Sequence, residues 1–137
     1  ESVVILHPDA SLEEQKTLFR KNQGIVQEAG GEVFAVDTWG KRTLANPILK
    51  NRKGIYFHSL FMAAPSVIAE LERTMRINDK VLRYLHVRLE ERMPLSKHQE
   101  KFKRQLAESA QREKEREAKI QARKAAAAAE REREREE

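Results

Sequence analysis

A basic stretch beside aromatic rings is the part of the sequence whose residue types suit binding chemistry. No acidic residue lies between Asp37 and Glu70. Five cations lie there beside four rings: Lys41, Arg42, Lys50, Arg52 and Lys53, with Trp39, Tyr56, Phe57 and His58. Cations that neutralise phosphates supply affinity for RNA, and exposed rings can stack on unpaired bases. The stretch therefore favours an RNA-binding surface, and a second basic region follows at Arg73, Arg76, Lys80, Arg83 and Arg88.

The alternative interpretation of the same residues is structural. Cations lie on the surface of every soluble protein, and Tyr56 and Phe57 are equally suited to a core. The aromatic motifs of an RRM domain are absent from the sequence. The net charge of +5 favours polyanionic partners only weakly, because much of the excess lies in a mixed-charge C-terminal region. From the pattern alone, both interpretations stay open.

Residue sets for catalysis or metal binding are missing from the sequence. Its four histidines, at positions 7, 58, 86 and 98, form no i,i+4 pair and have no acid at ligand spacing. The absence of cysteine excludes disulfides, thiolate metal sites and cysteine nucleophiles. There is no G-x-G-x-x-G motif and no P-loop lysine. We therefore expect a protein that is not an enzyme and that holds no cofactor and no metal.

Composition divides the 137-residue chain near Met93. Val, Ile, Leu and Phe are frequent before this point and almost vanish after it. About ninety residues can bury a real but thin core. We predict a folded domain over residues 1–93 and a charged extension over residues 94–137. No apolar run approaches the roughly 20 residues that span a bilayer, and no signal peptide is visible, so we expect a cytoplasmic protein.

Apolar patterning in residues 1–93 predicts six elements in the order β-α-β-β-α-β. The expected strands cover residues 2–6, 33–38, 54–62 and 80–89, and the expected helices begin at Ser11 and Pro65. Ser11 and Glu14 form a capping-box pattern, and Gly30-Gly31 ends the first helix. With right-handed crossovers this order gives a ferredoxin-like split β-α-β sandwich of class α+β. Its antiparallel four-stranded sheet carries both helices on one face.

The segment W-G-K-R-T-L-A-N-P-I-L at residues 39–49 is expected to be a strand that bends at Gly40 and stops near Pro47. Residues 46–53 form the end of a hairpin. The third strand has apolar groups on both faces and is therefore expected to be central. Alternation in the fourth strand places Tyr84 and Arg88 on the face that the helices leave open.

Helix-forming residues dominate after Pro94. Five alanines at 125–129 and the closing E-R-E-R-E-R-E-E have high helix propensity. Phe102 and Leu106 are the one large apolar pair at helical spacing, and sustained apolar heptads are missing, which argues against a coiled coil. We expect a long, charged, solitary helix that becomes ordered against a partner.

Several segments resemble one known family in order and spacing. They are V-I-L-H-P-D near the start, W-G-K-R-T-L-A-N-P-I at 39–48, G-I-Y-F at 54–57, P-S-V-I-A-E-L-E-R at 65–73 and M-R-I-N-D-K-V-L-R-Y at 75–84. Together they resemble the bacterial small-subunit ribosomal protein six family over roughly residues 1–92. The resemblance implies a ferredoxin-like fold, in agreement with the independently predicted element order.

The resemblance also implies a function and a set of site residues. It implies a structural constituent of the small ribosomal subunit, bound to the central domain, or platform, of its ribosomal RNA. The heterodimer partner would be the eighteenth small-subunit protein. The implied RNA-binding residues are Lys41, Arg42, Arg52, Lys53, Arg76, Lys80, Arg83 and Arg88. The implied partner-binding residues are Trp39, Leu44, Asn46, Pro47 and Ile48.

Two further functions are compatible with the same fold. One is an RNA- or protein-binding adaptor outside the ribosome, whose charged tail recruits a partner. The other is a small phosphatase-like hydrolase, which fold analogy alone supports. Such an enzyme needs an arginine cradled by a glycine-rich loop after the first strand, and His7-Pro8-Asp9-Ala10 offers neither.

Overall fold

The computed structural model describes the backbone of residues 1–136 and the side chains of residues 1–133. Its elements are β1 (Ser2–Leu6), α1 (Leu12–Glu28), β2 (Glu32–Ile48), β3 (Asn51–Met62), α2 (Ser66–Arg76), β4 (Val81–His86) and α3 (Leu95–Glu136). The last four side chains of the closing Glu-Arg run lie outside the described residues. The chain forms two compact units, Glu1–Gln99 and Glu100–Glu137.

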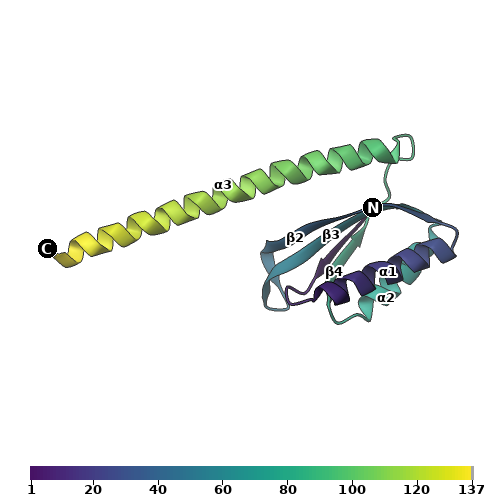
Figure 1. Cartoon of the computed structure of the whole chain (residues 1–137), viewed down its shortest axis with the longest axis horizontal. Coiled ribbons are helices and arrows are strands. Elements are labelled where there is room, and N and C mark those ends of the chain that lie inside the picture. Colours follow the sequence, from purple (N-terminus) through teal and green to yellow (C-terminus); the bar gives the residue numbers. More distant parts are fainter. Residues whose placement is uncertain (137) are drawn as a thin grey trace. The chain divides into compact units, whose positions relative to one another are not determined.

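The four strands form one antiparallel sheet in the order β2-β3-β1-β4. Both α1 and α2 lie on the same face of this sheet (Figure 1). The order confirms the predicted ferredoxin-like sandwich, and the third strand is central as expected.

The core lies between the two helices and the sheet face that they cover. Val4 and Leu6 of β1 and Leu71 and Met75 of α2 are all at most 5% exposed. The rings of Phe19 in α1 and Phe57 in β3 meet edge to face with centroids 4.4 Å apart. Fully burying one such side chain stabilises the fold by about 1.5–3 kcal/mol.

A capping box fixes the start of α1, as the sequence predicts. The Glu14 backbone N–H donates to Ser11 Oγ at 3.2 Å, and the Ser11 backbone N–H donates to Glu14 Oε2 at 2.9 Å. Two N–H groups that a helix start would leave unpaired are thereby satisfied.

Strands β2 and β3 form a hairpin that continues past the rest of the sheet. Leu6, the last residue of β1, pairs with Ile55, so residues 51–54 of β3 and their partners on β2 extend beyond β1. The register shifts between Thr38 and Gly40, and Gly40 has φ 74°, which confirms the predicted bend. The hairpin turns at residues 49 and 50, so β3 begins three residues earlier than predicted.

Strand β4 is shorter than predicted, and one of its faces was assigned wrongly. It covers Val81–His86 instead of residues 80–89. Tyr84 pairs with core residue Val4 and packs against the core, so it lies on the face covered by α1 and α2 rather than on the opposite face. Arg88 lies beyond the strand. The reason is a register shift opposite Ile5 and Leu6, which ends the simple alternation from residue 80 onward.

The C-terminal element α3 is one helix of 42 residues, as its helix propensity predicts. None of the helices that the structure describes is long and apolar enough to cross a membrane. The predicted domain boundary between residues 93 and 94 stays a prediction.

Candidate nucleic-acid interface

Three aromatic rings form a stack on the face of the sheet opposite α1 and α2. Trp39 lies nearly parallel to Tyr56 and His58, with centroids 5.9 Å and 5.6 Å away and interplanar angles of 12° and 16°. Phe57, between Tyr56 and His58, belongs to the core under the helices, so alternation places its two neighbours on the opposite face. The Arg42 guanidinium carbon lies 5.9 Å from the centre of the Trp39 ring, within cation–π range.

A buried hydrogen bond holds this stack in place. The His58 side chain is 3% exposed, and its Nε2 lies 2.9 Å from Glu1 Oε2. The pair fixes the imidazole against which the Trp39 ring stacks. Sequence reasoning missed this contact because its members are 57 residues apart and no local pattern connects them.

The hairpin presents cations without counterions. Lys41, Arg52 and Lys53 are exposed, and no other side chain among residues 1–133 forms an ion pair with them. Arg52 and Lys53 follow one another in β3. Successive side chains of a strand alternate, so the hairpin is basic on both faces. Close like charges without counterions suit a polyanionic ligand.

The second predicted basic region is largely paired within the fold. The pairs are Arg76 Nη2 with Tyr84 Oη at 3.3 Å, Lys80 Nζ with Glu14 Oε1 at 3.9 Å, and Arg88 Nη2 with Glu91 Oε1 at 2.7 Å. The hydrogen bond to Tyr84 raises the pKa of the Arg76 guanidinium. Arg83 differs, because it is exposed, pairs in register with Ile5 on the face opposite α1 and α2, and has no ion-pair partner among the described side chains.

The structure separates the five predicted partner-binding residues into two groups. Leu44 and Ile48 are buried, at 8% and 9% exposure, and Trp39 is half-buried in the ring stack. Asn46 and Pro47 are exposed. They lie on edge strand β2, where a register shift between residues 43 and 48 leaves the residues between them out of the pairing with β3.

Two histidines of the sheet, His58 and His86, form hydrogen bonds within the fold. His86 Nδ1 lies 3.2 Å from Glu72 Oε1, and its Nε2 lies 3.2 Å from Ser2 Oγ. Burial lowers the pKa of His86, against the opposing effect of the Glu72 carboxylate. Among the described residues, no group of three His, Cys, Asp or Glu side chains could hold a metal ion.

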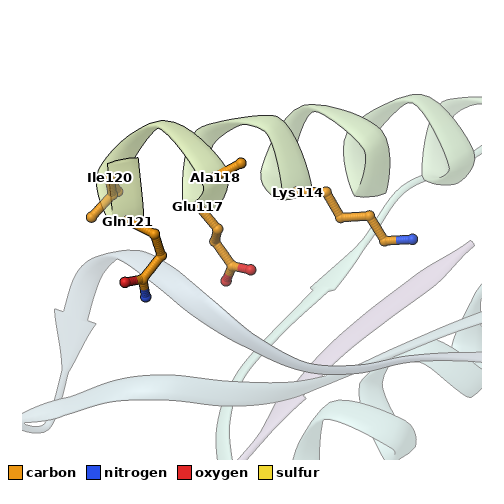
Figure 2. Close-up of a pocket in the computed structure, with 5 residues that line it drawn as sticks. All are labelled: Lys114, Glu117, Ala118, Ile120 and Gln121. Carbon is orange, nitrogen blue, oxygen red and sulfur yellow. The ribbon is translucent and has the colours of Figure 1, made fainter. Parts of the chain in front are cut away.

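A surface hollow lies along α3, in the second unit. Its lining residues are Lys114, Glu117, Ala118, Ile120 and Gln121 (Figure 2). All five come from one helix, whereas a small-molecule site needs polar groups that converge within a largely apolar cavity. We assign no small-molecule ligand to this hollow.

Comparison with known proteins gives the family. Residues 1–88 match the family model described as Ribosomal protein S6. The chain belongs to the ribosomal protein S6 family. This family consists of structural, non-enzymatic proteins of the small ribosomal subunit, so the chain is a ribosomal protein of the cytoplasm and not an enzyme.

Relatives within the S6 family cover most of the chain. The small ribosomal subunit protein bS6 of Bdellovibrio bacteriovorus is 64% identical over 114 residues, which are 83% of this chain and 75% of that protein. The bS6 protein of Caldanaerobacter subterraneus is 44% identical over 91 residues, 66% of this chain and 96% of its own. Because only 94 residues precede α3, the Bdellovibrio match includes at least 20 residues of that helix.

A solved structure of an S6 protein has the same fold. The crystal structure of 30S ribosomal protein S6 from Thermotoga maritima superposes with a TM-score of 0.59 at 25% identity. The match covers 76% of this chain and 94% of the Thermotoga chain.

Proposed function

We propose that this protein binds the central domain of small-subunit ribosomal RNA as a heterodimer with the eighteenth small-subunit protein. The observation that carries the proposal is the set of unpaired cations Lys41, Arg52 and Lys53 on the extended β2–β3 hairpin. Each phosphate that these cations neutralise releases condensed counterions, which increases the affinity for RNA. The affinity therefore falls as the salt concentration rises. Arg83 adds an exposed cation on the sheet face opposite α1 and α2.

The ring stack supports the hairpin as a stiff platform. Trp39 is held by the buried His58–Glu1 pair, and Arg42 lies over its ring. A preorganised surface loses little conformational entropy on binding, which favours affinity. RNA phosphates would then meet a positioned row of cations instead of a mobile loop.

The edge of β2 is the proposed contact with the partner protein. Asn46 and Pro47 are exposed there, beside residues that do not pair with β3. An edge strand has free backbone groups that another chain can use. Pro47 has no N–H, so the partner cannot continue a regular ladder through this position and would meet side chains and carbonyls.

A binding experiment across a salt series tests the RNA contact. We expect the triple variant K41Q/R52Q/K53Q to bind a central-domain ribosomal RNA fragment more weakly than the native protein. Its slope of log affinity against log salt should be smaller by about 2–3, from roughly 0.7–0.9 per lost phosphate contact. The matched control K16Q/R20Q/K21Q removes the same charge from α1 and should keep the native slope. Equal slopes for the two variants would contradict the proposal.

The partner contact is tested in the same assay with and without the eighteenth protein. The variant N46A/P47A should bind the RNA fragment alone like the native protein and lose the gain that the partner supplies. If the gain persists unchanged, the edge of β2 is not the partner site.

A further inference from the structure

The helix α3 carries a stripe of cations that takes no part in the RNA contact proposed for the β2–β3 hairpin. Arg112, Arg116, Lys119 and Arg123 follow one another at i, i+4, i+7 and i+11, so all four share one face of the helix. At 1.5 Å per residue the stripe is about 16 Å long. All four are exposed, and none forms an ion pair with a side chain of residues 1–133.

The four positions of the stripe hold cations over three turns, with Glu108 and Glu115 at its flank. Each cation of the stripe has another cation as its i,i+3 or i,i+4 neighbour, which destabilises an isolated helix, and only Arg112 and Lys119 have a glutamate four residues before them. The same turns carry Lys114, Glu117 and Gln121, three of the residues in Figure 2, on the side away from the stripe. That side therefore mixes a cation, an acid and an amide. An anionic ligand along the stripe would offset its internal repulsion.

We propose that the Arg112–Arg123 stripe binds the phosphate backbone of double-helical RNA. A straight row of cations matches a duplex, in which phosphates follow closely along the axis, with one charge per roughly 1.7 Å in DNA. No aromatic ring lies in residues 103–133, so stacking on unpaired bases, on which single-strand sites depend, is not available. That the duplex belongs to ribosomal RNA rests on the proposed function.

Other ligands fit the stripe less well. A partner helix needs apolar residues repeated along the contact, and a membrane surface needs a broad apolar face. Ile120 is the one large apolar residue between positions 107 and 133. Binding to this face therefore depends mainly on charge complementarity. We expect it to show no preference for RNA sequence.

The test compares two full-length quadruple variants that lose the same charge. R112Q/R116Q/K119Q/R123Q removes the stripe, and K103Q/R104Q/K114Q/K124Q removes cations from the other sides of α3. The probe is an RNA duplex of arbitrary sequence, and affinity is measured from low to physiological salt. The stripe variant should lose about 3 from the salt slope, at roughly 0.7–0.9 per phosphate contact, and bind at least tenfold more weakly at low salt. The control should keep most of the native slope.

Three outcomes would overturn the proposal. The first is an equal loss of duplex affinity in the two variants, and the second is a duplex affinity that neither variant changes. The third is a protein that binds anionic vesicles but not the duplex. Circular dichroism of both variants excludes a trivial loss of helix. The hairpin variant K41Q/R52Q/K53Q separates the two proposals, because it should lose affinity for the central-domain fragment while it keeps binding the arbitrary duplex through α3.

Discussion

Lys41 and Arg42 are neighbours in the sequence but have different surroundings. Lys41 is exposed without an ion-pair partner among the described side chains, whereas Arg42 is half-buried over the Trp39 ring and its Nε lies 3.4 Å from the Trp39 carbonyl oxygen. Lys41→Gln should weaken RNA binding and leave the free energy of unfolding within about 0.5 kcal/mol. Arg42→Gln should also lower that free energy, by about 0.5–1 kcal/mol for the lost cation–π contact. Urea unfolding beside RNA titration checks both. Equal stabilities would show that the Arg42 contact contributes nothing to the fold.

The hairpin turn stores backbone strain at two residues. Leu49 and Lys50 have φ of 47° and 66°, a left-handed pair that two-residue turns normally fill with Asn-Gly. Replacing them by L49N/K50G should raise the free energy of unfolding by about 1 kcal/mol, because the left-handed conformation is costly for most side chains. Lys53→Gly, in the same hairpin but in a strand, should instead destabilise. A lower urea midpoint for L49N/K50G would show that the native turn is unstrained.

Buried His86 should make stability depend on pH. Its folded pKa lies below the usual 6.5, so below that pH the unfolded chain binds the proton first and stability falls as pH falls. His86→Gln should flatten the decline in thermal midpoint between neutral and mildly acidic pH. His7→Gln, on the loop after β1, should keep the native decline. If the thermal midpoint of the His86 variant falls with pH as steeply as that of the native protein, another group causes the pH dependence.

At the scale of elements, close packing across the sheet depends on one glycine. A Cβ added at Gly54 would lie 2.5 Å from Ile5 Cγ2 and 3.4 Å from Leu44 Cδ2. Gly54→Ala should therefore cost about 1–3 kcal/mol through overpacking. Gly24→Ala is the matched control, because a Cβ there meets nothing within 4 Å in α1 and should stabilise by about 0.5–1 kcal/mol. Chemical denaturation should show a lower free energy of unfolding for Gly54→Ala and a higher one for Gly24→Ala.

Local patterns predict the elements well where local interactions decide them. The range of β1 matches residue for residue, because a β-branched run is stopped by His7-Pro8, and α1 begins at its capping box. The faces of β4 could not be predicted, because they follow from a register shift against β1 that only the assembled sheet creates. The same holds for the candidate site. The acid-free basic stretch is visible in the sequence, whereas the Glu1–His58 support of Trp39 is not.

At the scale of the whole molecule, the core is confined to the first unit. Every residue of the core cluster lies between positions 4 and 84. A chain ending at Gln99 should therefore unfold cooperatively and bind the central-domain RNA fragment with nearly native affinity, while it loses the binding of arbitrary duplex RNA that we assign to α3. Thermal denaturation and the two RNA probes check this. A molten, non-cooperative truncated chain would show that residues after Gln99 are needed to complete the fold.

The central position of β1 has a consequence for how the chain folds during synthesis. Residues 2–6 leave the ribosome before both of the strands that they pair with, which are at residues 55–59 and 81–86. At about 5–20 residues per second, synthesis from Leu6 to His86 takes roughly 4–16 s, during which β1 lacks at least one neighbour. The β2–β3 hairpin needs only nearby residues and can close earlier, so we expect it to be the template onto which the first strand later inserts. The order of folding is then the reverse of the order of synthesis: the hairpin that we propose meets RNA forms before the strand at the centre of the sheet is in place.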